Sequence, residues 1–358
     1  MRTKPGKKWS RRRRRRFSTK LSRERKSGYR DRRRSGRRRS ARTLRGQADS
    51  PVLYEKEHDL IMDSESENPS LEGEEQENSS GMLESSLRDA YEAGYREGYF
   101  EGGEGIVTRL LPPNMIMPGV TVEGLIASGI RQLAPEEMIP LLPPHEVARA
   151  LQDAMDDKLH LSVIRLGDGE LLTLAHDTIL PVEEVRKRGP FLPYSGVELP
   201  AHSIREALAD ALRKADIIGV PQSRHPSFQG LLLPVFRHYG LNPASLRLTS
   251  STVNYALEEE GLLLPLLQGR KVLIVGNRAE GLALALQPHD IEISGLITPV
   301  RGVHDTELVV RAASGYAFDI ALVAAGIAAV LICTEIASRL GKPAFDFGHL
   351  ANKLESGA

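Results

Sequence analysis

The sequence predicts an α/β protein with a Rossmann-like, doubly wound, mostly parallel sheet, preceded by a charged N-terminal region that is disordered when free. Two observations lead to this class. Beyond about residue 142, short apolar segments alternate with amphipathic ones, as in a sheet with helices on both faces. Before residue 105, charge dominates: residues 1–50 hold 23 basic and 3 acidic residues, a net charge of +20, and residues 51–105 hold 3 and 16, a net charge of −13.

Residues 1–50 form an arginine-rich tail that includes six consecutive arginines, Arg11 to Arg16. Such a segment repels itself and has little apolar surface to bury, which predicts disorder. Because arginines near phosphates release counterions, we expect the tail to bind a polyanion, such as nucleic acid or a spore or cell-surface component. The alternative is a solvated tail that pairs loosely with the acidic segment after it.

Residues 51–105 form an acidic linker that ends in a four-residue repeat. On a helix this period places tyrosines on one stripe and glycines on another, which lets a partner helix approach closely. The repeat therefore suggests a homo-oligomer. A marginal linker helix is the alternative, because three glycines weaken it. The repeat reads Tyr91-Glu-Ala-Gly94, Tyr95-Arg-Glu-Gly98, Tyr99-Phe-Glu-Gly102.

Composition excludes several classes of protein. The single cysteine, Cys333, excludes a disulfide framework and a cysteine-based zinc cluster, and it fits a reducing compartment. The longest apolar run, 320–333, has 14 residues, fewer than the roughly 18 that a membrane-spanning helix needs. No apolar core follows the basic N-terminus, as it would in a signal peptide. We therefore expect a cytoplasmic protein.

A connecting segment, 106–141, leads to the predicted catalytic domain, 142–358. In a doubly wound domain, ligands bind beyond the carboxyl ends of the strands, so functional residues are expected in the loops that follow them. Seven apolar stretches are predicted as strands, namely 161–166, 217–220, 246–249, 271–275, 291–297, 320–324 and 344–347. Five amphipathic stretches are predicted as helices, namely 201–214, 228–239, 278–286, 306–313 and 328–340.

The most informative loop follows the first predicted strand and reads Arg165-Leu-Gly167-Asp168-Gly169-Glu170. In extended backbone, Asp168 and Glu170 project to the same side, and two such carboxylates suit one Mg²⁺ or Mn²⁺ ion that also binds substrate phosphates. Arg165 would bind a further phosphate oxygen or pair with Asp168. On spacing alone, an equal alternative is that Asp168 caps the following helix and Glu170 favours its positive end.

Two loops at the same edge supply polar groups for ribose, base or sugar, although ordinary loop polarity also explains them. They contain Gln222, Ser223 and Arg224 after the strand 217–220, and Thr252 and Asn254 after the strand 246–249.

The turn after the strand 271–275 and the end of the last strand complete the set of candidates. Backbone N–H groups at Gly276 and Asn277 suit a phosphate, but a tight turn that requires glycine is the alternative. Asn277 is also a candidate for a helix cap or for contact with a sugar or base. Asp346 and His349 are candidates for sugar contact or for a catalytic base, and otherwise serve as turn or cap groups.

The loop from Arg165 to Glu170 resembles the signature of glycosyltransferases with the GT-D fold, whose members carry an Asp-x-Glu motif. The stretch Ala324-Ala-Gly326-Ile-Ala-Ala, followed by Leu340-Gly-Lys-Pro-Ala-Phe-Asp346-Phe-Gly348-His349, is similar to the last strand–helix–strand unit of that family. The resemblance spans roughly 142–352. It implies a domain that transfers a sugar from a nucleotide-diphosphate sugar to a glycan or protein acceptor. Asp168 and Glu170 would then hold the Mn²⁺ or Mg²⁺ ion that neutralises the leaving diphosphate.

Two other functions fit the same residues. The first is a non-catalytic Rossmann-like assembly module on a polyanion-binding arm, which the arginine tail and the Tyr/Gly repeat suggest. The second is a phosphohydrolase that uses the same cation and differs only in accepting water.

Overall fold

A computed structural model describes residues 77–357. The arginine-rich tail and the acidic linker up to residue 76 lie outside the described residues, so the predicted disorder and polyanion contact stay predictions. The chain divides into two compact units, Met1–Tyr95 and Arg96–Ala358. Helix α2 (Glu77–Tyr99) begins in the first unit, and every other described element belongs to the second.

The second unit is built on a seven-stranded, all-parallel sheet with the order β3-β2-β1-β7-β6-β4-β5, which confirms the predicted fold class. Each predicted strand agrees with an observed one to within two residues at either end, because continuous apolar runs mark strands that are buried on both faces. The strands are β1 (Leu161–Arg165), β2 (Ile217–Val220), β3 (Leu248–Ser250), β4 (Lys271–Gly276), β5 (Glu292–Ile297), β6 (Ile320–Ala324) and β7 (Pro343–Asp346).

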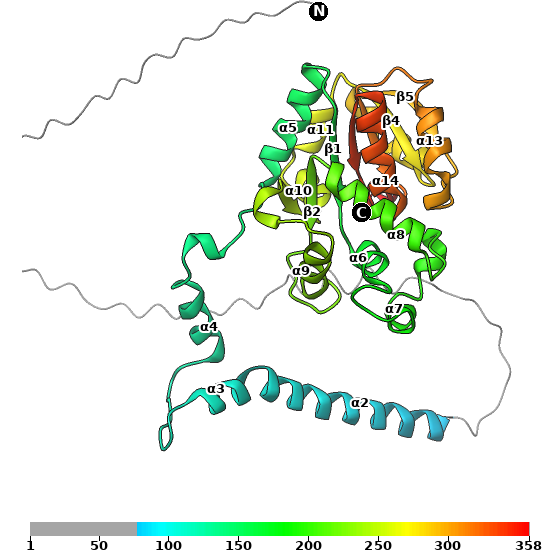
Figure 1. The fold of residues 1–358 in the computed structure, drawn as a ribbon. Helices are drawn as coiled ribbons and strands as arrows, with labels where there is room; N and C mark the ends of the chain where they lie inside the picture. The colour runs from blue at the N-terminus through cyan, green and yellow to red at the C-terminus, as the bar shows by residue number, and fades with distance from the viewer. Residues whose placement is uncertain (1–76, 358) are drawn as a thin grey trace, which may run out of the picture. The chain divides into compact units, whose positions relative to one another are not determined.

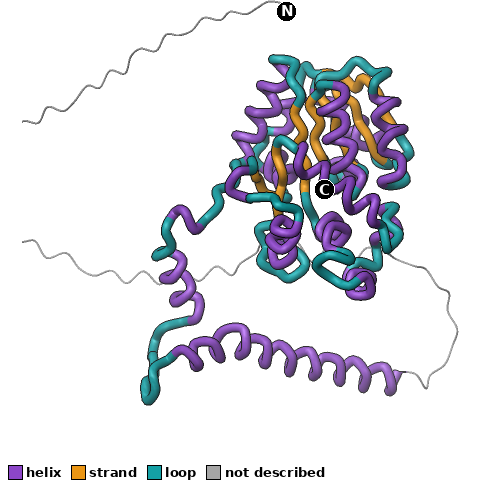
Figure 2. Tube along the Cα trace, viewed as in Figure 1, coloured by secondary structure: helices purple, strands orange, loops and turns teal. Residues whose placement is uncertain are grey.

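Helices cover both faces of this sheet (Figures 1 and 2). None of the described helices has the length and the apolar composition that a membrane crossing requires. One face carries α6 (Asp168–Ala175), α7 (Val182–Arg188), α8 (His202–Lys214), α9 (Gln229–His238), α13 (Thr306–Ala313) and α14 (Ala328–Glu335). The other carries α5 (Pro144–Asp156), α10 (Val253–Glu259), α11 (Leu263–Leu267), α12 (Ala279–Leu286) and α15 (Leu350–Ser356). Two helices, α3 (Gly105–Leu110) and α4 (Val122–Ile130), precede the sheet.

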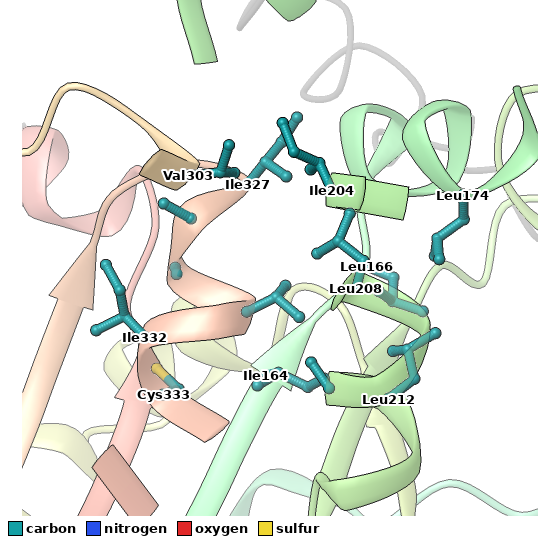
Figure 3. Packing of buried hydrophobic residues seen from close by; sticks show 14 of the residues in the cluster. Ile164, Leu166, Leu174, Ile204, Leu208, Leu212, Val303, Ile327, Ile332 and Cys333 are labelled. Carbon is teal, nitrogen blue, oxygen red and sulfur yellow. The ribbon is translucent and has the colours of Figure 1, made fainter. Parts of the chain in front are cut away.

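Each face of the sheet has its own apolar core, because successive side chains of a strand point to opposite faces. On β1, Val163 joins the core under α5, whereas Ile164 joins the core under α8 and α14. Figure 3 shows the second of these cores, with Ile164 between Leu212 of α8 and Cys333 of α14. Cys333 is fully buried there, which confirms its interpretation as a core residue, and burial raises the pKa of its thiol.

The structure departs from the predicted elements in three places. Strand β3 starts at Leu248, two residues later than predicted. It follows the 3₁₀ turn Pro243–Ser245, in which the Asn242 side chain accepts from the N–H of Ala244 at 3.1 Å. Helix α14 stops at Glu335 and continues as a π-helical turn, Ile336–Leu340. Helices α3, α4, α5, α7, α10 and α11 were not predicted.

The chain reverses its winding between β1 and β7. From β1 it proceeds through β2 to β3 on one side, and it then returns through β4, β5 and β6 on the other. Helix α6, which follows β1, covers one face, whereas α15, which follows β7, covers the opposite face. The loops after these adjacent strands therefore diverge, and in open α/β sheets the resulting crevice is where ligands bind.

Candidate functional site

Arg165, the last residue of β1, joins the ends of two strands at this crevice. Its Nε donates to the carbonyl oxygen of Asp346 on β7 at 2.9 Å, and its Nη2 donates to Asp346 Oδ1 at 2.9 Å. The Arg165 backbone N–H donates to Asp346 Oδ2 at 3.2 Å. Of the two alternatives for Arg165, the ion pair with Asp168 is wrong, because Arg165 pairs with Asp346, 181 positions away in the sequence; binding of a phosphate oxygen stays a prediction.

The Arg165 guanidinium is also fixed from the β3 side. Its Nη1 donates to the carbonyl oxygen of Ser251 at 3.1 Å and to Asn254 Oδ1 at 3.2 Å. Buried Asn254 in turn donates from Nδ2 to the carbonyl oxygen of Phe347 at 2.9 Å. Gly348 lies so close that a Cβ there would be 1.7 Å from Arg165 Nη2. Arg165 and Asn254 thus hold three strand ends together.

Asp168 and Glu170 lie in the first turn of α6, so the expected extended geometry is wrong. Residues two positions apart on a helix point in directions about 200° apart. Asp168 Oδ1 accepts from the N–H of Gly169 at 2.8 Å, and Glu170 Oε2 accepts from the N–H of Gly167 at 2.7 Å. The Glu170 contact is the return bond of a capping box to the N-cap Gly167, whereas Asp168, the first residue of α6, accepts only from the next N–H. A carboxylate has two oxygens, so each contact engages one of them.

Negative charge accumulates where these elements meet. Glu170 has its pKa raised from 4.5 to about 7, first by burial and then by the negative charge of Asp346, while the N–H of Gly167 and the charge of Arg165 oppose the rise. Burial also raises the pKa of Asp346, and Arg165 counteracts it. The half-buried Glu170 and the buried Asp346 therefore repel each other, and Arg165 is the cation that partly compensates them.

His349 lies at the outer side of this cluster. It is exposed, directly precedes α15, and its charge lowers the pKa of Asp346. The structure therefore brings His349 together with Asp346, Arg165 and Glu170 at the ends of β1 and β7, as expected for residues that follow adjacent parallel strands.

The polar loops after β2 and β3 lie at the same carboxyl-terminal edge of the sheet as the loop after β1. In the sheet, β2 lies next to β1, and β3 lies next to β2. Gln222 and Arg224 are exposed, and the Ser223 hydroxyl accepts from the N–H of His225 at 3.3 Å. Thr252 is exposed, and its hydroxyl lies 2.8 Å from that of Ser250. Asn254 differs from these residues, because its buried side chain bonds to the protein through both its oxygen and its nitrogen.

The Gly276–Asn277 turn lies at the end of β4, which β6 and β7 separate from β1. Gly276 has φ +140°, and a Cβ there would lie 2.1 Å from the carbonyl oxygen of Ala324, so the requirement for glycine in this turn is confirmed. Asn277 Oδ1 accepts from the N–H of Val300 at 2.8 Å. Its side chain thus ties β4 to the loop after β5.

One wall of this edge was not predicted from the sequence. Segment 189–199 comes close to two regions that follow strands. A Cβ on Gly302, which follows β5, would lie 2.7 Å from the carbonyl oxygen of Ser195. A Cβ on Gly169, in the first turn of α6 after β1, would lie 3.4 Å from the Phe191 ring. A cavity of about 440 Å³ lies within this segment, away from Arg165 and Asp346. Gly169 and Gly302 could have indicated from the sequence that another segment comes close at these positions. Only the fold shows that this segment is 189–199. The cavity is lined by Arg186, Gly189, Pro190, Leu192, Pro193, Val197, Glu198 and Leu199.

Comparisons with known proteins find one matching family model and two similar solved structures. The family model described as the GT-D fold-like domain matches residues 142–354. Two solved structures of domain of unknown function 1792 are similar, each over 62% of this chain and 83% of that chain. One is selenomethionine-substituted, with 19% identity and a TM-score of 0.43. The other, described as having a distinct glycosyltransferase fold, has 20% identity and a TM-score of 0.45. No curated protein matches the chain.

Proposed function

Because the chain belongs to the family of GT-D fold-like domains, we propose that it is a metal-dependent glycosyltransferase. It moves a sugar from a nucleotide-diphosphate sugar to a glycan or protein acceptor. The observation that supports this most is the placement of Asp168, Glu170 and Asp346 around the crevice between β1 and β7. That crevice is where doubly wound sheets bind nucleotides.

The acidic residues suit a hard divalent cation, Mn²⁺ or Mg²⁺. Within residues 77–357, no group of three or more histidine, cysteine, aspartate or glutamate side chains is arranged to hold a metal ion. In this proposal the cation is held by the second carboxylate oxygens of Asp168 and Glu170, whose first oxygens accept from the N–H groups of Gly169 and Gly167, and it takes the rest of its ligands from water and donor phosphates. When bound, it would neutralise the charge that develops on the leaving diphosphate.

The remaining residues of the site have separate roles. Arg165 and Asn254 fix the ends of β1, β3 and β7, so that the carboxylates keep their positions when a donor binds. The N-terminal N–H groups of α6 favour negatively charged ligands at the same place. In this proposal His349, which is exposed and close enough for its charge to act on Asp346, accepts a proton from the acceptor hydroxyl.

Donor hydrolysis and sugar transfer, measured with Mn²⁺ and with EDTA, test this function. We expect activity to require the cation and to fall by at least about 100-fold in Asp168→Ala, because loss of groups that merely support a metal ligand already costs about 10–100-fold. The matched control is Glu280→Ala, which removes an exposed acid from the first turn of α12, at the end of β4. Full activity in EDTA or in Asp168→Ala would remove the metal role.

The +20 charge of residues 1–50 favours a second candidate function, a non-catalytic assembly module that binds a polyanion. Calorimetry with a nucleotide sugar and with nucleic acid separates the two. Binding of nucleic acid alone, with strong salt dependence, would favour the assembly module, whereas binding of the nucleotide sugar with Mn²⁺ supports the transferase. Release of free sugar without transfer to any acceptor would identify a hydrolase.

A further inference from the structure

His176, which follows the last residue of α6, has both of its ring nitrogens in contact with the backbone. Its Nδ1 lies 2.6 Å from the carbonyl oxygen of Thr173, and its Nε2 lies 3.1 Å from the backbone nitrogen of Ala201, directly before α8. The carbonyl oxygen can only accept a hydrogen bond, and the N–H of Ala201 can only donate one. These contacts therefore require a neutral imidazole that carries its proton on Nδ1.

The hydrogen bond between His176 and Ala201 closes the base of a long connection between two helices. Residues 177–200, which we call the α6–α8 connection, contain α7 and the wall segment 189–199 (Figure 1). His176 and Ala201 flank this connection, and both are buried. The wall segment comes close to the first turn of α6 and to the loop after β5. A change at the base of the connection therefore acts on a segment that borders the candidate site.

Charged and titratable neighbours of His176 determine how readily it takes up a second proton. Arg205 of α8 donates to the carbonyl oxygen of His176 at 3.0 Å, and the ring of His202 stacks on that of His176 with the centroids 5.6 Å apart. Asp177 Oδ2 lies 2.9 Å from His202 Nε2. Burial lowers the pKa of His176 below its ordinary value of 6.5. The carbonyl oxygen of Thr173 opposes this shift, Arg205 and His202 add to it, and Asp177 opposes it.

Two more titratable side chains border these groups. The Glu206 carboxylate of α8 lies 2.8 Å from the guanidinium of Arg205. Tyr239, at the end of α9, donates its hydroxyl proton to the carbonyl oxygen of Leu174 at 3.1 Å, and burial raises the pKa of its phenol. Glu206 is thus paired with Arg205, and Tyr239 is a neutral donor, so neither supplies an acceptor for a protonated His176.

A proton on Nε2 of His176 removes this arrangement. Nε2–H and the N–H of Ala201 would then be two donors that face each other, and each would lose its buried partner. The added positive charge would also lie beside Arg205. We propose that His176 is a pH-sensitive anchor of the α6–α8 connection, which loosens when the imidazole becomes protonated. The anchor would act in the same way whatever reaction the site catalyses.

The direction of the pH dependence follows from the neutral imidazole. Because the pKa of His176 is lower in the folded state, the native protein binds this proton less firmly than the unfolded chain does. The stability that the anchor contributes is therefore fully present above pH 6.5, the ordinary pKa of histidine. It is lost as the pH falls from 6.5 through the lower pKa of the folded state.

Amide hydrogen exchange of the full chain between pH 8 and pH 5, corrected for the pH dependence of exchange in an unstructured chain, tests this anchor. Since each opening takes up one proton, we expect protection in residues 177–201 to fall by up to about tenfold per pH unit below the ordinary histidine pKa. Peptides from β1 and β6, in the centre of the sheet, should stay protected. Protection in residues 177–201 that is the same at pH 8 and pH 5 would overturn the proposal.

Three substitutions identify the group that titrates. His176→Gln keeps an oxygen that can accept from Ala201 but takes up no proton, so protection should no longer depend on pH. His202→Gln removes the stacked neighbour and leaves His176 in place, so the loss of protection at low pH should remain. His289→Gln, which replaces an exposed histidine in the turn Gln287–His289, should behave like the wild type. A loss that persists in His176→Gln, or that disappears in His202→Gln, would assign the effect to another group and contradict the anchor.

NMR of the protein with ¹⁵N-labelled histidine decides the matter even if His176→Gln does not fold. At pH 8 the wild type should show a histidine that is protonated on Nδ1 alone, and this histidine should titrate below pH 6.5. Asp177→Asn removes the acid that raises the pKa of His176, so the titration should move to lower pH. A wild type without a histidine of this form, or a titration of it at or above pH 6.5, would refute the neutral anchor.

Discussion

Replacing Glu170 by glutamine should stabilise the protein at alkaline pH and not at acid pH. The pKa of Glu170 rises from 4.5 to about 7 on folding, so the native state holds this proton more firmly than the unfolded state. The stability that Glu170 contributes is therefore fully present below pH 4.5 and is lost as the pH rises to about 7. Glutamine keeps an oxygen for the N–H of Gly167 but carries no charge, so it avoids this loss.

The size of the effect follows from the pKa. Each pKa unit corresponds to about 1.4 kcal/mol, so the rise from 4.5 to about 7 corresponds to about 3 kcal/mol above pH 7. Because the Glu170 side chain retains some exposure to solvent, screening reduces this figure, and we expect a difference of roughly 1–3 kcal/mol. Below pH 4.5 the variant and the wild type should be equally stable.

Urea unfolding of Glu170→Gln and the wild type at pH 4.5, 6 and 8 measures the difference. Other titrating groups are common to both proteins and cancel in the comparison. Glu280→Gln, at the exposed first turn of α12, should leave the free energy of unfolding within about 0.5 kcal/mol of the wild type at every pH. A stability difference between Glu170→Gln and the wild type that does not grow with pH would refute the reasoning, because it would mean that Glu170 is neither buried nor opposed by Asp346.

Two further substitutions test the framework of the site by urea unfolding. Asp346→Ala leaves the Arg165 guanidinium, which is 16% exposed, without its ion-pair partner, and we expect a loss of about 3 kcal/mol; a loss below about 1 kcal/mol contradicts a strand-joining role. Gly276→Ala places a Cβ 2.1 Å from the carbonyl oxygen of Ala324 at φ +140°, which should cost at least about 2 kcal/mol. Gly261→Ala, at φ +67° with open space around it, isolates the cost of backbone conformation, about 1 kcal/mol.

The strands could be predicted because their apolar character is local. Each residue range such as 217–220 or 320–324 is apolar throughout, and burial on both faces requires that. The order of the strands is not local: β7, the last in the chain, lies between β1 and β6. The sequence of β7 does not indicate which strands pair with it. The position of the crevice next to Asp346 is therefore known only from the fold.

The sequence indicated which polar residues lie near the ends of the strands better than it indicated how they are arranged there. Parallel strands bring their following loops to one edge, so Asp346 and His349 could be expected near the loop after β1. The contacts of Arg165 with Asp346 and Asn254 span 181 and 89 positions and depend on the strand order. The conformation of Asp168 and Glu170 was predicted wrongly because the switch from strand to helix falls between Gly167 and Asp168, and the alternation of side chains ends there.

Capping and cation binding make different demands on Asp168 and Glu170, and that difference is measurable. As caps, both carboxylates are satisfied by the N–H groups of Gly167 and Gly169, and a divalent cation should leave stability unchanged. As ligands, they gain a partner that also offsets the repulsion between Glu170 and Asp346, so Mn²⁺ at about 100 times its dissociation constant should stabilise the native state by about 3 kcal/mol. This gain should disappear in Glu170→Gln at pH 8, where the variant without the cation is the more stable protein. Under the proposed function, the charge of Glu170 that weakens the fold would be the charge that the cation requires, as expected where a structure gives up stability for function.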